Sequence, residues 1–264
     1  MAAPDDGKVR VWTANLDLGA EAINALARLL SDDERQRAAR FRFRRDSIRF
    51  VASRAILRTI LAECLGVEPC LVDFTYGPHG KPELAAPFER SGLRFNVSHS
   101  ASVGLYAVTA QRRVGVDIEC LRPLRDLEGI ARRVFSARER QVLSQLPSAE
   151  RLQGFFNCWT RKEAYIKAIG EGLSRPLDRF TVTLAPRTVC SLEYVDGDLA
   201  EARRWTLEAL ALDPMYTAAI VIEGRPSQLA CVRWLASGEF LSEPRASIWG
   251  EALESRALEG MPLC

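Results

Sequence analysis

The stretch Val114-Gly115-Val116-Asp117-Ile118-Glu119 is the starting point for predicting the fold. Side chains alternate between the two faces of a β-strand, so the three β-branched residues share one face, while the glycine and both carboxylates share the other. The Cα atoms of Asp117 and Glu119 would lie about 7 Å apart, so their repulsion needs water or a cation to offset it. Oxygen ligands beside retained waters suit Mg²⁺. If these six residues are considered alone, the interpretation as a polar strand edge that faces water is favoured over the interpretation as a metal site.

Further β-type runs lie on both sides of this hexapeptide and are separated by small polar residues. Two precede it and four follow it: residues 93–97, 103–109, 180–184, 205–210, 217–222 and 229–235.

Helical signals occur between these runs. Ser31 to Glu34 and Ser136 to Glu139 both have capping-box spacing, in which the two side chains satisfy backbone donors at a helix start. Apolar residues at helical spacing predict one helix from about residue 46 to Gly66 and another over about residues 149–169. Helices and strands occur in both halves, so the sequence predicts an α+β protein. We expect two similar lobes, divided into residues 1–110 and 111–236, with an accessory tail at 237–264.

The composition is that of an ordinary globular protein. The chain has 264 residues, 47% of them hydrophobic and 27% charged, and a formal net charge of +2. This charge is too small to indicate nucleic acid or an anionic membrane as a partner. Residues 1–17 contain no continuous apolar core, so we expect neither a signal peptide nor a membrane anchor, and predict a cytoplasmic protein.

The seven cysteines are scattered and form no CxxC pair. Their odd number and irregular spacing fit neither a zinc site nor a disulfide framework. Cys64, Cys158 and Cys231 lie among apolar neighbours, where a free cysteine acts as a small buried hydrophobe.

Trp159-Thr-Arg-Lys-Glu163-Ala-Tyr-Ile-Lys167 places a carboxylate and an ammonium four residues apart on one helix face. Alone, the pair reads as a surface ion pair that stabilises the helix by only about 0.3–0.5 kcal/mol. The functional interpretation is that Glu163 adds a third carboxylate, as metal ligand or base, and that Lys167 offsets charge on a phosphate.

Phe95-Asn-Val-Ser98-His99-Ser100 contains one of two histidines in the chain. A lone histidine is more often structural than catalytic, but this cluster also supplies donors for an anion, and a protonated His99 can pair with phosphate. The sequence has no Gly-x-Ser-x-Gly elbow, which weighs against a serine hydrolase.

Basic residues are concentrated between residues 35 and 49, which include seven arginines. Most are expected on solvated helix faces, and one or two can clamp a phosphate. Gly80-Lys81-Pro82 adds a lysine in a turn, which is a weak signal by itself.

Taken together and in this order, residues 80–82, 95–100, 115–119 and 159–167 resemble the 4′-phosphopantetheinyl transferases of the Sfp type, which activate surfactin synthetase and similar assembly lines. The combination is specific. The resemblance covers about three quarters of the chain. It extends upstream into the arginine-rich region from Ser31 to Arg58, and it ends before the tail.

The resemblance implies a monomer of two pseudo-symmetric lobes, each a small sheet packed with helices, with coenzyme A in the cleft between them. It implies that the first lobe binds coenzyme A and that the second carries the metal and catalytic residues. The substrate would be an apo acyl-carrier or peptidyl-carrier protein, and the product its holo form with 3′,5′-ADP. No nucleic-acid or membrane partner is implied.

The resemblance also assigns roles to individual residues. Mg²⁺ would be held by Asp117, Glu119 and Glu163, and Glu163 would also be the base for the carrier serine. Lys167 would stabilise the pyrophosphate as 3′,5′-ADP leaves. Coenzyme A would be contacted by Arg37, Lys81, Ser98 and His99. Glu34 stands near Arg37, where relatives often have a basic residue.

Two alternatives come from other functional classes. The first is a catalytically silent protein that binds coenzyme A or a carrier, against which the complete Asp/Glu/Glu/Lys set argues. The second is nucleic-acid binding through the arginine cluster, which has few interleaved aromatic residues and lies beside Asp32, Asp33 and Glu34. We expect the tail to pack against a lobe that is already complete and to contribute no catalytic group.

Overall fold

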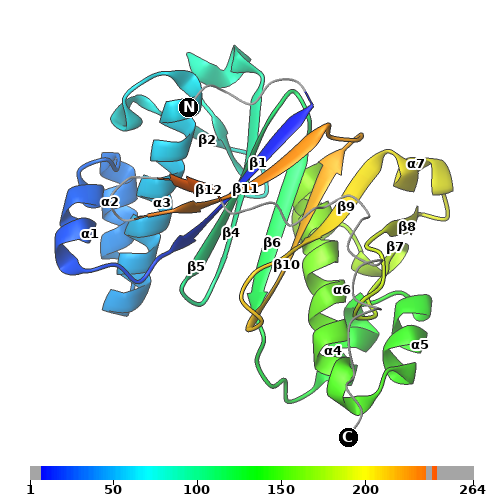
Figure 1. Cartoon of the computed structure of the whole chain (residues 1–264). Helices are drawn as coiled ribbons and strands as arrows, with labels where there is room; N and C mark the ends of the chain where they lie inside the picture. Colours follow the sequence, from blue (N-terminus) through cyan, green and yellow to red (C-terminus); the bar gives the residue numbers. More distant parts are fainter. Residues whose placement is uncertain (1–6, 236–239, 243–264) are drawn as a thin grey trace, which may run out of the picture.

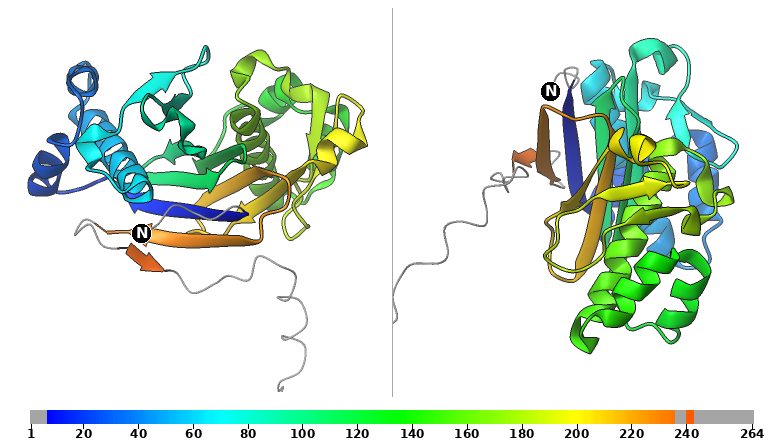
Figure 2. Two further views of the ribbon diagram at one scale, coloured as in Figure 1. Left: turned by 90° about the horizontal axis from the view of Figure 1, so that it is seen from above. Right: turned by 90° about the vertical axis from the view of Figure 1, so that its right-hand side faces the viewer.

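The chain forms two α+β lobes that meet along the edges of their sheets (Figure 1). The computed structural model describes residues 7–235 and 240–242. Seen from above, α3 and α6 lie on the same side of the strands, while β1 (blue) and β11 (orange) form the opposite side (Figure 2). The mixture of helices with small sheets confirms the predicted fold class.

The first lobe is built on a five-stranded sheet of order β12-β11-β1-β5-β4. Its strands are β1 (Lys8–Asn15), β4 (Leu93–Ser100), β5 (Val103–Ala110), β11 (Gln228–Trp234) and β12 (Phe240–Ser242). Its other elements are α1 (Ala20–Ala27), α2 (Asp32–Ala39), α3 (Arg44–Leu65), and the hairpin of β2 (Phe74–Tyr76) and β3 (Pro82–Leu84). Apolar residues of α3 pack against one face of the sheet, where Trp12 and Tyr106 are buried.

The second lobe is built on a three-stranded sheet of order β6-β10-β9. Its strands are β6 (Val114–Cys120), β9 (Trp205–Leu210) and β10 (Tyr216–Glu223), with a separate hairpin of β7 (Phe180–Val182) and β8 (Leu192–Val195). Its helices are α4 (Leu127–Val134), α5 (Ala137–Gln145), α6 (Ser148–Ile169) and α7 (Leu199–Arg203). Short 3₁₀ turns are η1 (Pro69–Leu71) and η2 (Phe88–Ser91) in the first lobe, and η3 (Gly172–Ser174) and η4 (Leu177–Arg179) in the second.

A third apolar cluster joins the two lobes. Val9 and Val11 of β1 are buried with Val116 and Ile118 of β6 and with Ile220 of β10. The faces of the two sheets that point away from α3 and α6 therefore pack on each other. Burial of this shared core, at about 25 cal/mol per Å² of apolar surface, favours one rigid assembly over two loosely tethered lobes.

Local sequence signals explain several helix ends. Both predicted capping boxes form: the Ser31 amide donates to Oε2 of Glu34 at 3.1 Å, and the Ser136 amide donates to Oε2 of Glu139 at 2.7 Å. Gly66 and Gly170 end α3 and α6 with positive φ angles of 70° and 80°, which glycine adopts without the Cβ penalty. Of the cysteines expected in the core, Cys64 and Cys158 are buried and Cys231 is half-buried.

The chain returns to the first lobe near its end. After β10, strand β11 runs parallel to β1, with Lys8 opposite Gln228 and Ala14 opposite Trp234. The predicted division at residues 110/111 places β11 in the second lobe, yet its hydrogen-bonding partner belongs to the first. That division remains a prediction. If the chain is divided there, β11 belongs to the second half by sequence and to the sheet of the first lobe by its pairing with β1.

The predicted tail lies mostly outside the described residues. Within it, only β12 is described, and this strand pairs antiparallel with β11 over three residues. Among the described helices, none is long and apolar enough to cross a bilayer.

Candidate functional site

The candidate site lies where the edge strand of each sheet meets the other. β4 and β6 belong to different sheets, and side chains of alternate β4 residues bridge them. Asn96 accepts from the Val116 amide through Oδ1 at 2.8 Å, and Ser98 donates from Oγ to Oδ1 of Asp117 at 2.8 Å. Ser100 donates from Oγ to Oε2 of Glu119 at 2.9 Å. Three polar side chains thus join β4 to β6 in place of a backbone ladder, and two of them, Ser98 and Ser100, hold the carboxylates of β6.

Strand β6 presents its two faces as the alternation predicts. Its β-branched residues enter the apolar cluster between the sheets, and Asp117 and Glu119 point toward α6. At Gly115, the same face touches the helix backbone. A Cβ there would lie 2.1 Å from the Ala164 carbonyl oxygen and 2.3 Å from the Ala168 amide nitrogen. The absence of a side chain at Gly115 therefore brings α6 against the two carboxylates.

Helix α6 contributes the other two predicted catalytic residues. Lys167 donates from Nζ to Oδ1 of Asp117 at 2.6 Å and to Oγ of Ser98 at 2.9 Å. Glu163 lies one turn earlier and forms no ion pair with Lys167 among the described residues. The alternative of a solvated surface ion pair between Glu163 and Lys167 is therefore wrong, because Lys167 is engaged across the seam between the lobes.

Asp117 is 4% exposed, and its Oδ2 atom has no hydrogen-bond partner within the described structure. Its surroundings exclude the alternative of a strand edge facing water. Burial raises the pKa of Asp117 against the opposing effect of Lys167. A buried carboxylate oxygen without a donor is destabilising unless a donor or a cation reaches it.

Burial also disfavours the ionised form of the other two carboxylates. Burial raises the pKa of Glu163, and the charges of Asp117 and Glu119 raise it further against the opposing charge of Lys167. Burial also raises the pKa of Glu119, where a hydrogen bond from Ser100 acts against it and Asp117 adds repulsion. The donor set is hard oxygen, which fits Mg²⁺. Within the described part of the chain, no three His, Cys, Asp or Glu side chains already surround a common point, so retained waters would have to complete the shell.

Two predicted contacts for coenzyme A lie at this seam besides Ser98. His99 follows Ser98 on β4 and keeps an exposed edge. Desolvation by the cleft walls lowers its pKa, and Lys167 and Arg49 add like-charge repulsion, so the imidazole is mainly neutral at pH 7. Lys81 lies in the turn between β2 and β3 and donates from Nζ to the Lys167 carbonyl oxygen at 2.6 Å.

Arg37 makes no contact with the other predicted site residues within the described structure. It is exposed on α2, and its guanidinium lies 5.2 Å from the centre of the Phe50 ring. Its neighbour Glu34 is 2% exposed and forms ion pairs of 2.7 Å with Arg54 and Arg58. Burial opposes ionisation of Glu34, but the two arginines outweigh it and hold its pKa below the usual value.

Sequence reasoning missed several residues that build the site. Asn96 and Ser100 were grouped with Ser98 as donors for an anion, whereas they hold β6 in place. The signal was their alternation with Phe95, Val97 and His99, since residues two apart on a strand share a face. The sequence motif includes Gly115 but does not predict its contact with α6, because close packing of a helix leaves no local sequence signal.

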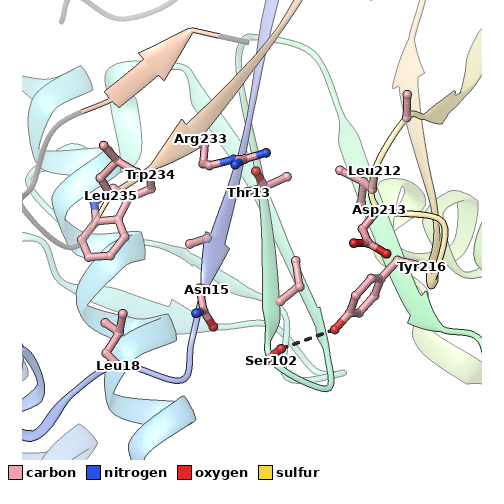
Figure 3. Close-up of a pocket in the computed structure, with 13 residues that line it drawn as sticks. Thr13, Asn15, Leu18, Ser102, Leu212, Asp213, Tyr216, Arg233, Trp234 and Leu235 are labelled. Carbon is pink, nitrogen blue, oxygen red and sulfur yellow. Dashed lines mark hydrogen bonds between the residues drawn. The ribbon is translucent and has the colours of Figure 1, made fainter.

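A larger hollow lies elsewhere, beside the tip of the β4–β5 hairpin (Figure 3). It has a volume of about 560 Å³, and within the described chain none of the predicted site residues lines it. Ser102 and Tyr216 line it, and their hydroxyl oxygens are hydrogen-bonded at 3.4 Å. Size alone does not identify the functional site here, because the three carboxylates with raised pKa values belong to β6 and α6 at the seam and not to this hollow.

Two family models match the chain. One is described as "4′-phosphopantetheinyl transferase superfamily" and matches residues 113–221, and the other as "4′-phosphopantetheinyl transferase, N-terminal" and matches residues 18–112. Among curated relatives, the 4′-phosphopantetheinyl transferase HetI of Nostoc sp. is 42% identical over 217 residues, which is 82% of this chain and 88% of HetI.

Two Bacillus proteins are also similar to this chain. The 4′-phosphopantetheinyl transferase psf-1 of Bacillus pumilus is 33% identical over 75% of this chain and 81% of its own length. The 4′-phosphopantetheinyl transferase Sfp of Bacillus subtilis is 31% identical over 64% of this chain and 72% of its own.

Proposed function

Since the chain belongs to the 4′-phosphopantetheinyl transferase superfamily, we propose that it transfers the 4′-phosphopantetheine group of coenzyme A to a serine of an apo acyl- or peptidyl-carrier protein. The observation that carries this proposal is the seam between β4, β6 and α6. There, the Lys167 ammonium pairs with Asp117, and Asp117, Glu119 and Glu163 have raised pKa values, with the charge of Asp117 acting on the other two. This set matches the charges that phosphoryl transfer develops.

The three carboxylates Asp117, Glu119 and Glu163 are the residues that would hold Mg²⁺. Their support is the orphaned Oδ2 of Asp117 and the burial that raises the pKa of all three, to which the charge of Asp117 adds at Glu119 and Glu163. When bound, Mg²⁺ supplies positive charge that offsets the negative oxygens of the pyrophosphate. The carboxylates fit Mg²⁺ because their hard oxygen atoms are the kind of ligand that this ion prefers.

The remaining steps are assigned to residues of this chain. The serine Oγ of the carrier attacks the β-phosphorus of coenzyme A, and the bond from that phosphorus to the bridging oxygen breaks. The electron pair leaves with 3′,5′-ADP, and the serine proton passes to Glu163. The raised pKa of Glu163 suits a group that accepts a proton near neutral pH.

Lys167 serves the leaving group in this scheme. Its ammonium is held at the seam by Asp117 and Ser98 and keeps an exposed side, with 28% of the side chain accessible. An ammonium in that place stabilises the charge that grows on the departing pyrophosphate oxygen. Arg37, Lys81, Ser98 and His99 are proposed as contacts for coenzyme A, and Lys81 retains two N–H groups for this after its bond to the Lys167 carbonyl.

We also propose that the protein acts as a cytoplasmic monomer. Support for the monomer comes from the seam itself, since both of its walls belong to one chain. The absence of nucleic-acid and membrane partners remains a prediction.

The test is to incubate purified protein with coenzyme A, Mg²⁺ and several apo-carriers, and then to weigh the carriers by mass spectrometry. A gain of one phosphopantetheine group is expected, and it should disappear with excess chelator. Binding of coenzyme A without a mass gain on any carrier would instead support the catalytically silent alternative. Transfer at full rate in chelator would remove Mg²⁺ from the proposal.

A further inference from the structure

Lys81 connects the first lobe to the end of helix α6. Its ammonium donates to the carbonyl oxygen of Lys167, which lies in the last turn of α6. The last four carbonyls of a helix lack partners within the helix. The Gly170 amide satisfies Ile166, and the side chain of Lys81 satisfies Lys167. A residue from the opposite lobe therefore caps this helix at the residue whose ammonium reaches Asp117.

Lysine is rare in this chain, and its placement is selective. Only four of the 36 basic residues are lysines: Lys8, Lys81, Lys162 and Lys167. Lys162 is buried, and its ammonium donates to the carbonyls of Leu177 and Phe180 at 2.6 Å each. The compact ammonium of lysine, on its flexible side chain, can donate to a single carbonyl in a space where the planar guanidinium of arginine does not fit. Lys162 belongs to α6 and donates from the helix, in addition to its ion pair with Glu139, whereas Lys81 donates to the helix from the first lobe.

The turn that carries Lys81 also packs against the chain after α6. Gly172 has a positive φ of 60°, and a Cβ there would lie 2.8 Å from Cβ and Cγ of His79. Residues of the turn and of the helix end together line a cavity of about 350 Å³. Desolvation lowers the pKa of Lys81 to about 8, which agrees with an ammonium enclosed between the two elements. The contact is thus a packed junction rather than a single surface hydrogen bond.

We propose that Lys81 is a positioning residue for Lys167: by holding the Lys167 carbonyl, it fixes the last turn of α6, from which the Lys167 ammonium reaches Asp117 and Ser98. This inference rests on the proposed transferase function for its kinetic consequence. It differs from the predicted role of Lys81 as a contact for coenzyme A, because it acts through another residue. Small misplacements of a reacting group are costly, so the effect belongs to turnover more than to binding.

A double-mutant cycle distinguishes the positioning of Lys167 by Lys81 from a direct contact of Lys81 with coenzyme A. Lys81→Met should lower kcat by about tenfold or more, with a smaller change in the affinity for coenzyme A measured by calorimetry. In a Lys167→Met background, Lys81→Met should change kcat by less than about twofold, because the residue through which it acts is already gone. Independent, multiplicative losses in the double variant, or an unchanged kcat in Lys81→Met, would overturn the proposal.

Arg94 provides a matched control. It lines the same cavity and is an exposed cation, and within the described structure it forms no hydrogen bond or ion pair with α6. Arg94→Met should leave kcat within about twofold of the wild type. A kcat loss equal to that of Lys81→Met would show that general positive charge in the cavity matters, and the positioning role would be refuted.

Hydrogen exchange tests the contact without any activity. In substrate-free protein, Lys81→Met should speed exchange of the amides of residues 166–170, while those of α3 keep their rates. Equal rates at residues 166–170 would contradict the proposal even if kcat fell. Should Lys81→Met not fold by circular dichroism, Lys81→Gln replaces it in both measurements. A wild-type protein that modifies no carrier would refute the transferase function, while the exchange result would still decide whether Lys81 holds the helix end.

Discussion

The Nζ atom of Lys167 lies 2.6 Å from Oδ1 of Asp117, so the ammonium on helix α6 and the carboxylate on strand β6 are joined at the seam between the lobes. Only 6% of the Asp117 side chain is exposed, against 28% of the Lys167 side chain. The buried partner is therefore the carboxylate, and the cation keeps a side open to the cleft. The following predictions start from this asymmetry and from the packing that produces it.

Lys167→Met should lower kcat by about 10²–10³ while changing the affinity for coenzyme A much less, because a donor aimed at developing charge acts mainly in the transition state. Steady-state kinetics with an apo-carrier and calorimetry with coenzyme A measure the two quantities. A parallel collapse of affinity and rate would show that Lys167 is chiefly a binding contact.

Asp117→Asn should abolish transfer but leave the circular dichroism spectrum unchanged, because the amide keeps the shape of the side chain. We also expect Mg²⁺ to raise the Tm of the wild type, since ligand binding to the folded state stabilises it, and to raise the Tm of the variant much less. Thermal unfolding with and without Mg²⁺ measures this. An equal Tm gain in both proteins would place the cation elsewhere.

Gly115→Ala should lower the free energy of unfolding by about 1–3 kcal/mol and reduce transfer, because the new Cβ would overlap the backbone of α6. Gly19→Ala is the control, since nothing lies within 4 Å of a Cβ at that position. Urea unfolding of both variants checks the prediction. Equal stability of the two would mean that α6 can shift without cost.

Glu34→Gln should lower the free energy of unfolding by about 3–5 kcal/mol, because Arg58 would remain charged in the core with its partner neutralised. The folded-state pKa of Glu34 is lowered, so its contribution is present above the unfolded value near 4.5 and is lost as pH falls through the folded value. The difference from wild type should therefore shrink in urea titrations below about pH 4.

Asp32→Asn is the matched control for Glu34→Gln, because its ion pair with Arg35 is exposed. That variant should change stability by less than about 1 kcal/mol at any pH. A similar loss in both variants would contradict the special role of the buried pair.

Truncation after Ser237 should leave a folded protein with near-normal transfer. The part of the removed segment that the structure describes, β12, pairs only with the outer edge of β11, away from the β4–β6 seam. Activity assays with circular dichroism as the fold control measure the effect. A folded but inactive truncated protein would assign the tail to the carrier or coenzyme A site.

Local pattern was sufficient to predict most of the elements. The run at Trp205 to Leu210 is β9, the apolar spacing from about Ala149 to Ile169 is α6, and both capping boxes form. In these cases the deciding physics lies within one or two turns or strands. Helix α3 begins at Arg44, slightly earlier than predicted, because Phe43 precedes it in an extended conformation without a side-chain cap.

Long-range relationships could not be predicted in this way. No local pattern indicates that Glu34 is buried against Arg54 and Arg58, because that contact joins two helices. The pairing of Lys167 with Asp117 likewise depends on Gly115 bringing α6 close to β6. The motifs indicated which residues carry the chemistry, whereas their partners come from tertiary packing.

The parallel pairing of β1 with β11 also constrains how the protein can be made. Lys8 faces Gln228, so about 220 residues (228 minus 8) are synthesised between β1 and this parallel neighbour. At 5–20 residues per second, that delay is roughly 10–40 s. During it, one edge of β1 lacks its strand, so the first lobe is incomplete and this edge is open to pairing with other chains. Separate expression of the two halves should consequently give insoluble protein, and co-expression of both should be needed to recover it.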